Sequence, residues 1–154
     1  MLSTKDISYS VMSGTGWINE PFYSEIKKLM PLPCVDLLIV NKGRLLLMKR
    51  NNSPANGLWF TPGGRIRKGE SIETAVIRKL KEETALEPIS IKQAGVMSHV
   101  WPKVQTITVF YIVHVLSDKI VMNDEHSDYK WIKSVEEDTH PYIVYMINES
   151  KIFK

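Results

Sequence analysis

One segment of the sequence, residues 63–86, holds the side chains best suited to chemistry. It opens with a Gly-Gly pair, passes a short basic loop and continues into a stretch with helical periodicity. Along that stretch Arg78 and Glu82 are four residues apart, and so are Lys79 and Glu83, so each pair can meet on one helix face. Such pairs alone are typical of a solvated helix. The preceding glycines favour a second interpretation, because they free the backbone to turn a carbonyl toward the helical carboxylates.

A backbone carbonyl beside clustered glutamates is a set of hard oxygen ligands. Magnesium prefers such ligands, and it leaves the remaining coordination positions to water and substrate phosphate. The segment therefore predicts a magnesium site for a phosphorylated substrate. The helix that carries the glutamates is expected to begin after Ser71, a suitable N-cap, and to present Ile72, Ala75, Val76 and Leu80 as one apolar stripe.

The spacing of these residues resembles the Nudix box. The matching residues are Gly64, Glu70, Arg78, Leu80, Glu82, Glu83 and Leu86. Two positions depart from the pattern: Lys79 stands where the family usually has a glutamate, and Ala85 where it usually has a glycine. In the left-handed conformation that glycine allows, alanine costs about 1 kcal/mol, unless the helix continues by another residue. The resemblance implies an α/β fold, the Nudix α/β/α sandwich with a mixed β-sheet.

A second segment, residues 124–131, resembles one Nudix subfamily, GDP-mannose mannosyl hydrolase. That subfamily has a similar Asp-Tyr-basic-Trp strand, preceded by a catalytic histidine and a metal ligand, and the match assigns these roles to His126 and Glu125. Taken alone, His126 beside acids in a loop would be a solvated histidine. Residues 52–70 also share the subfamily's Pro-Ala, Gly-x-Trp-Phe and Pro-Gly-Gly-Arg positions.

The departure at Lys79 has a physical meaning within this resemblance. An ammonium group cannot ligate magnesium, and it repels cations nearby, so one metal ion is favoured over a cluster. The subfamily lacks the same glutamate. We therefore expect His126 to supply the base, because an unperturbed imidazole titrates near neutrality.

The resemblance implies a site in which one Mg²⁺ binds the diphosphate of a nucleotide sugar or a related nucleoside diphosphate. The expected ligands are the Gly63 carbonyl, Glu83 and Glu125, with Glu82 an additional or water-mediated contact. In this mechanism the metal offsets the charge that builds on the leaving nucleoside diphosphate.

The same resemblance assigns the remaining site residues. Arg50 and Arg65 would add charge-assisted contacts to the phosphates. His126 would take a proton from the water that attacks the anomeric carbon, which makes His126 and Arg50 the candidate catalytic residues. Asp36 interrupts an apolar strand and needs a partner, so it is either a hydrogen-bonded structural acid or part of the ligand pocket.

Three functions remain open at this point. The first is hydrolysis at carbon, which releases a nucleoside diphosphate and a free sugar. The second is water attack on phosphorus, with ADP-ribose, other nucleotide sugars or nucleoside triphosphates as substrates, and the retained Glu82 and Glu83 favour it. The third is a nucleotide-binding module that has kept the fold and lost the chemistry, as the change at Lys79 alone would suggest.

Length and composition are those of one globular domain with its own core. The chain has 154 residues, 44% hydrophobic and 24% charged, and a net charge of +3, which is too weak to argue for nucleic acid. Its single cysteine, Cys34, excludes an internal disulfide and is consistent with a reducing compartment. No apolar run approaches the roughly 18 residues of a membrane span. We expect a cytoplasmic protein without membrane contact, and the family resemblance suggests a homodimer.

The elements that must position the site follow from hydrophobic pattern and turn residues. Residues 1–30 are expected to form an N-terminal extension with a short helix from Pro21, and residues 31–154 the Nudix hydrolase domain. The predicted strands cover residues 35–40, 44–49, 58–61, 89–97, 107–116 and 129–132, and a C-terminal helix covers 142–147. Between two of these strands, His99 and Trp101 would either line a pocket mouth or lie in a surface loop.

Overall fold

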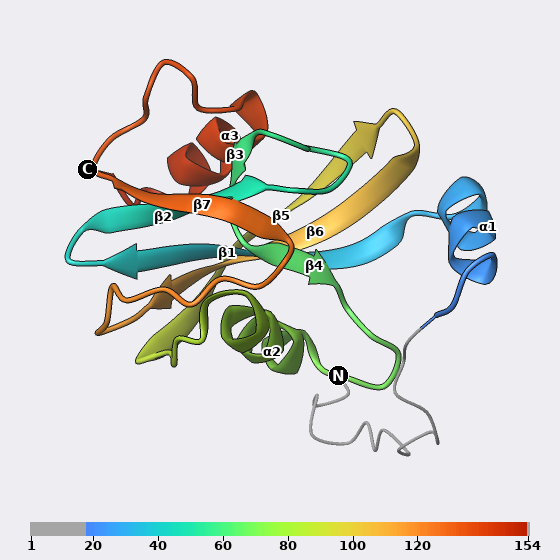
Figure 1. Ribbon diagram of the computed structural model, residues 1–154, viewed down its shortest axis with the longest axis horizontal. Helices are drawn as coiled ribbons and strands as arrows, with labels where there is room; N and C mark the ends of the chain where they lie inside the picture. The colour runs from blue at the N-terminus through green and yellow to red at the C-terminus, as the bar shows by residue number, and fades with distance from the viewer. Residues whose placement is uncertain (1–17, 154) are drawn as a thin grey trace, which may run out of the picture.

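The computed structural model describes residues 18–153 of the chain (Figure 1). Its helices and strands alternate in the pattern of an α/β protein. In chain order they are α1 (Phe22–Leu29), β1 (Leu32–Asn41), β2 (Arg44–Arg50), β3 (Trp59–Phe60), β4 (Gly63–Arg65), α2 (Ile72–Thr84), β5 (Ser90–Trp101), β6 (Val104–His114), β7 (His126–Ile132) and α3 (Pro141–Ser150).

A parallel pair of strands lies at the centre of a mixed sheet. β1 runs parallel to β6, with Leu32 opposite Thr106 at one end and Val40 opposite His114 at the other. β1 also pairs antiparallel with β4, and a hairpin joins it to β2, which is antiparallel to it as well. β5 pairs with the far side of β6, while β3 and β7 pair with β2. The predicted α/β class with a mixed sheet is confirmed.

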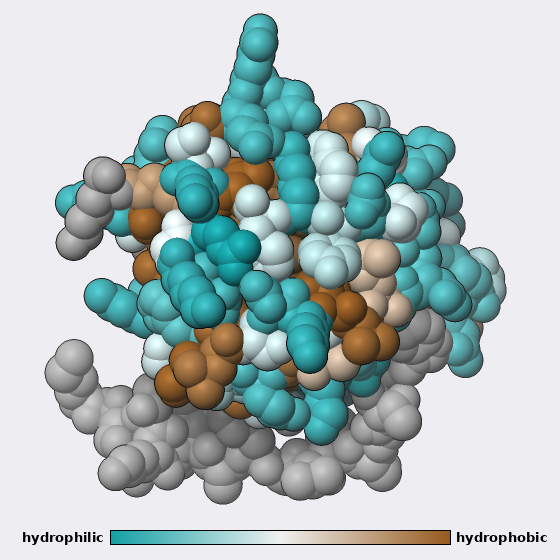
Figure 2. Space-filling model, turned by 60° about the vertical axis from the view of Figure 1, so that its left-hand side comes forward, coloured by the Kyte–Doolittle hydropathy of each residue, from teal (hydrophilic) through white to brown (hydrophobic). Residues whose placement is uncertain are grey.

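Alternation along β1 builds two cores, one on each face of the sheet. Val35, Leu37 and Ile39 pack in the core that α2 covers, whereas Leu38 packs in the core that α3 covers. The two helices therefore lie on opposite faces of the sheet, which gives the three layers of the predicted sandwich (Figure 1). On the outside, Figure 2 shows a face where hydrophilic side chains dominate and hydrophobic ones form separate small groups.

Helix α2 begins as predicted and ends differently. The Ser71 hydroxyl accepts a hydrogen bond of 3.1 Å from the backbone N–H of Thr74, which confirms the N-cap. At the other end Ala85 adopts the left-handed conformation, with φ 58°, and its N–H donates to the carbonyl of Lys81. The alternative in which the helix continues by another residue is therefore wrong.

Several elements differ in length from the prediction. β5 runs on to Trp101, and a two-residue turn leads directly into β6, so His99 and Trp101 belong to a strand rather than a loop. β7 begins at His126, which places this histidine in the sheet. α1 begins one residue after Pro21 and buries none of its side chains.

The predicted extension of residues 1–30 contains α1, and its first 17 residues lie outside the described part of the chain. None of the helices between residues 18 and 153 is long and apolar enough to span a lipid bilayer.

Candidate active site

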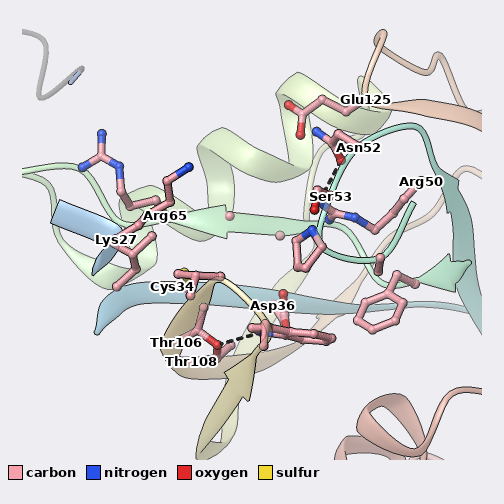
Figure 3. Close-up of a pocket in the computed structure, with 18 of the residues that line it drawn as sticks. Lys27, Cys34, Asp36, Arg50, Asn52, Ser53, Arg65, Thr106, Thr108 and Glu125 are labelled. Atoms are coloured by element: carbon pink, nitrogen blue, oxygen red, sulfur yellow. Dashed lines mark hydrogen bonds between the residues drawn. The ribbon is translucent and has the colours of Figure 1, made fainter. Parts of the chain in front are cut away.

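A cleft of about 740 Å³ lies beside β1, β4 and the exposed side of α2. Residues from the loop after β2 and from the turn between β5 and β6 complete its walls. Figure 3 shows Arg50 and Glu125 at one end of the cleft and Lys27 and Arg65 at the other, with Asp36 between them. The cleft thus joins cationic side chains from distant parts of the sequence, as a polyanionic ligand requires.

Arg78 fixes the loop between β4 and α2. Its guanidinium forms a two-pronged ion pair with Glu70, with Nη2–Oε1 at 2.6 Å and Nε–Oε2 at 3.0 Å. The same Nη2 donates to the carbonyl of Arg65, and Nη1 lies 3.2 Å from Glu82. Hydrogen bonds from Arg78 and a backbone N–H lower the pKa of Glu70 in spite of its partial burial, so this carboxylate stays charged. The expected Arg78–Glu82 pair is confirmed. Arg78 also holds the loop between β4 and α2 through its bonds to Arg65 and Glu70.

Lys79 lies among three carboxylates of the site. Its Nζ is 2.6 Å from Glu83, 3.3 Å from Glu125 and 3.6 Å from Glu82. Only 7% of the Lys79 side chain is exposed, and only 1% of Glu83. Burial alone would lower the pKa of Lys79, but the carboxylates, Glu83 above all, raise it above its usual value. The side chain is therefore an ammonium ion held among Glu82, Glu83 and Glu125, which together form the acidic cluster.

His126 contacts the opposite side of Glu83. Its Nε2 lies 2.5 Å from Oε2 of Glu83, and 1% of each side chain is exposed. Neither residue lines the cleft, whereas Glu82 and Glu125 do, with 37% and 38% of their side chains exposed. The structure thus brings His126 to the predicted metal ligands, but behind Glu83 rather than at the cleft surface.

The predicted magnesium ligands can be tested against this arrangement. Glu82, Glu83 and Glu125 converge as expected, but they converge on Lys79, and the two oxygens of Glu83 face Lys79 and His126. Across residues 18–153, no group of three or more His, Cys, Asp or Glu side chains is placed to hold a metal ion. The three carboxylates predicted together with the Gly63 carbonyl therefore do not fit magnesium as a preformed site, because the Lys79 ammonium already occupies the space between them.

The three predicted substrate-binding residues all line the cleft. Arg50 Nη2 donates to Oδ1 of Asn52 at 2.8 Å, which directs the guanidinium along the β2–β3 loop. Arg65 lies at the end of β4, with its guanidinium carbon 5.8 Å from the centre of the Tyr23 ring. Asp36 accepts a hydrogen bond of 2.7 Å from the Tyr142 hydroxyl, so the partner expected for this buried strand position exists.

Gly63 is required for the close approach of β4 to β1. A Cβ at this position would lie 2.1 Å from Oδ1 of Asp36 and 2.4 Å from the carbonyl oxygen of Val35. The absence of a side chain therefore lets β4 pack against the Asp36 carboxylate at the cleft.

An aromatic wall, which the sequence interpretation did not predict as a unit, closes one side of the cleft. It consists of Phe60, Trp101 and Tyr142, whose ring centres lie 5.2–5.9 Å apart. His99 packs on Trp101 at 4.2 Å. Only Trp101 carried a signal, as a possible pocket residue, and nothing in the sequence placed Phe60 or Tyr142 beside it. Flat aromatic surfaces of this kind suit a nucleobase.

Comparison with protein families matches residues 30–142 to the model described as NUDIX domain. Among curated proteins, the chain is 30% identical over 122 residues to the low-salt glycan biosynthesis protein Agl8 of Haloferax volcanii, covering 74% of this chain and 78% of Agl8. It is 35% identical over 99 residues to the ADP-ribose pyrophosphatase of Methanocaldococcus jannaschii, covering 63% of this chain and 59% of that protein.

Among solved structures, the chain resembles the NUDIX domain of Shewanella oneidensis NrtR complexed with ADP ribose. The TM-score is 0.62 at 28% identity, and the match covers 78% of this chain and 88% of that domain. A similar fold thus occurs in a domain whose solved structure holds ADP ribose.

Proposed function

Because the chain belongs to the NUDIX domain family, we propose that it is a Nudix hydrolase that cleaves a nucleoside diphosphate joined to a second group, such as ADP-ribose or a nucleotide sugar. The observation that carries the proposal is a single cleft in which arginines from β2, β4 and the following loop face an aromatic wall. This arrangement suits a ligand with a diphosphate between two less charged ends.

Arg50 and Arg65 are proposed to bind the diphosphate. They reach the cleft from β2 and β4, and guanidinium groups pair with phosphate oxygens through two parallel hydrogen bonds. Trp101 and Phe60 are proposed to pack against the base or the second group. Glu82 and Glu125 are the carboxylates of the acidic cluster that reach the cleft surface, so they can accept a proton from an attacking water.

Mg²⁺ is the proposed metal, and divalent ions are the usual partners of Nudix hydrolases. A diphosphate in solution already carries Mg²⁺ as its counterion, and magnesium often reaches a protein site with its phosphates and few carboxylates. We propose that the substrate is taken up as this magnesium complex. Glu82 and Glu125 are exposed enough to meet it, whereas Glu83 is occupied by Lys79 and His126.

A second candidate is hydrolysis at the anomeric carbon, as in GDP-mannose mannosyl hydrolase, with GDP-mannose as the substrate and His126 as the base. The lysine at position 79 and the contact between His126 and Glu83 favour it, because an imidazole beside a carboxylate is suited to taking up a proton. Since His126 does not line the cleft, this mechanism requires its contact with Glu83 to open. The name of the relative Agl8, which refers to glycan biosynthesis, supports a sugar nucleotide.

The position of attack can be measured with ¹⁸O-labelled water. The enzyme is incubated with MgCl₂ and either ADP-ribose or GDP-mannose, and the products are analysed by mass spectrometry. Label in a phosphate supports attack on phosphorus, and label in the free sugar supports attack on carbon. If the folded protein binds these nucleotides but turns none of them over, hydrolysis is excluded and a nucleotide-binding module remains.

His126→Ala tests the base assignment in the same assay. If His126 is the base of the carbon reaction, turnover should fall by about 10²–10⁴-fold. His114→Ala is the matched control, because His114 is exposed at the end of β6, opposite Val40, and does not line the cleft. A His126→Ala enzyme with nearly the turnover of the control would remove the histidine from the mechanism.

Three further assignments stay proposals. We propose that residues 31–154 form the catalytic domain and residues 1–30 an extension of it. A homodimer is proposed because apolar side chains of α1 and β5 are exposed, including Phe22, Leu29 and Val100, and sedimentation equilibrium would test it. Cytoplasmic localisation stays a prediction from cysteine content.

A further inference from the structure

The Lys79 ammonium occupies a position that is unusual for a lysine. It lies within 3.6 Å of three carboxylates, those of Glu82, Glu83 and Glu125, and it is almost completely shielded from water. Glu83 needs a positive charge beside it, because an unpaired buried carboxylate is strongly disfavoured, and Glu82 and Glu125 add negative charge at the same point from the cleft side. In this chain the positive charge is part of the protein.

The surroundings of Lys79 hold it in this position. Its side chain passes against Gly64, where a Cβ would come 3.0 Å from the lysine Cε and 3.4 Å from Nζ. Glu83, the nearest carboxylate, is held on its other side by His126. The Glu125 carboxylate in turn accepts a hydrogen bond of 3.4 Å from the side-chain nitrogen of Asn123. The ammonium therefore uses space that a side chain at position 64 would fill, and it lies between carboxylates that have partners of their own.

We propose that Lys79 is an internal cation that takes the place of a protein-bound metal ion. Its ammonium positions the carboxylates of Glu83 and Glu125 and closes the acidic cluster to divalent cations in the absence of substrate. Lys79 is thus a positioning residue for the cleft. The inference deepens the proposed function, because it concerns the same site, but it makes a statement about the substrate-free protein.

The test measures Mn²⁺ binding to the full chain without nucleotide, by the electron paramagnetic resonance signal of free Mn²⁺. The wild type should show no tight site. Lys79→Glu, which removes the cation and adds a carboxylate, should bind one Mn²⁺ at least tenfold more tightly than the wild type. Lys79→Gln, which only removes the charge, should show a smaller gain of at least twofold.

Two controls assign the effect to the cluster. Lys81→Glu makes the same change of charge two residues away, where 72% of the side chain is exposed, and it should bind Mn²⁺ as the wild type does. Adding Glu83→Gln to Lys79→Glu should abolish the gain. Circular dichroism establishes that each variant is folded.

Two results would overturn the inference. One is a wild type that binds Mn²⁺ within tenfold of Lys79→Glu and loses the site on Glu83→Gln, because the cluster would then already be a metal site. The other is a pair of folded Lys79 variants with no gain over Lys81→Glu. If the Lys79 variants do not fold, comparing the wild type with Glu83→Gln decides the point: a Mn²⁺ site that Glu83→Gln weakens tenfold contradicts the inference, and no such site supports it. These outcomes do not depend on turnover, so the proposed hydrolase activity can fail independently.

Discussion

Tyr142 and Asp36 form a hydrogen bond of 2.7 Å across the cleft floor, although they lie 106 positions apart in the sequence. Tyr142 lies at the start of α3, and its hydroxyl donates to Asp36 on the central strand β1. The same hydroxyl can instead donate to the hydroxyl of Thr108 on β6, at 3.3 Å. The contact ties the helix on one face of the sheet to the strand that borders the cleft.

Asp36→Asn should remove a pH dependence of stability. Burial raises the pKa of Asp36 to about 7, and the Tyr142 hydrogen bond only partly opposes it. Between about pH 4 and pH 7 the unfolded carboxyl is ionised while the folded one keeps its proton, so the unfolded state binds fewer protons and wild-type stability should fall as pH rises. Asp36→Asn should not show this fall in urea unfolding followed by tryptophan fluorescence.

Asp118→Asn is the matched control for this measurement. A hydrogen bond from Arg44 lowers the pKa of Asp118, so this group titrates below the window, and the variant should keep the wild-type slope between pH 4 and 7. If the unfolding free energies of the wild type and Asp36→Asn change with pH in parallel, Asp36 is ionised in the folded protein between about pH 4 and 7, which contradicts the prediction.

Lys79→Met should be strongly destabilising. Methionine keeps the apolar stem but removes the ammonium that pairs with the buried Glu83, and breaking a buried pair on one side costs about 3–5 kcal/mol. Lys81→Met, on the exposed side of the same helix, breaks only a surface pair with Glu87 and should cost less than about 1 kcal/mol. Free energies of unfolding from urea titration distinguish the two; equal effects would mean that Glu83 takes up a proton or reaches water once the lysine is gone.

Ala85→Gly should stabilise the protein. Ala85 has φ 58° at the end of α2, where a Cβ costs about 1 kcal/mol and glycine is tolerated. For a chain of this size, that gain corresponds to roughly 2–4 °C in the midpoint of thermal unfolding. The same substitution inside the helix, Ala75→Gly, should destabilise by about 1 kcal/mol or more. A loss of stability in Ala85→Gly would contradict the left-handed helix end.

Gly63 and Gly64 should differ in their tolerance of alanine. At Gly63 the new Cβ would lie 2.4 Å from the backbone oxygen of Val35, so strand β4 has to move; overpacking of this kind costs about 1–3 kcal/mol, and substrate affinity should fall with it. At Gly64 the Cβ would lie 3.0 Å from Cε of Lys79, so only the end of one side chain has to shift, by a few tenths of an ångström, and the cost should stay below about 1 kcal/mol. Unfolding titrations and KM values of both variants test the order, which reverses if Lys79 cannot move.

Local patterns predicted much of the fold. The N-cap at Ser71, the apolar stripe of α2 and the alternating or continuous apolar runs of β1, β2 and β6 are short-range signals, and the elements formed where these signals lie. The strand ends at Trp101 and His126 were missed because pairing with neighbouring strands, not local composition, decides where they stop.

In the site, contacts within one helix were predicted, whereas contacts between distant elements were not. Spacing along one helix is enough to bring Lys79 and Glu83 together, and the box pattern is enough to identify the carboxylates. Sequence spacing cannot show that the lysine reaches between those carboxylates, or that Tyr142 supplies the partner of Asp36, because both depend on contacts between distant elements.

The parallel pairing of β1 with β6 has a consequence for how the chain folds during its synthesis. During synthesis, β1 has no neighbour on its β6 side until residues 104–114 have left the ribosome. The reason is that Leu32 pairs with Thr106, which is synthesised much later. Pairings of such long sequence separation form slowly and leave apolar strand edges uncovered meanwhile. We expect the nascent segment before β6, residues 1–103, which already carries the whole Nudix box, to depend on a chaperone or on rapid translation until β6 has been synthesised.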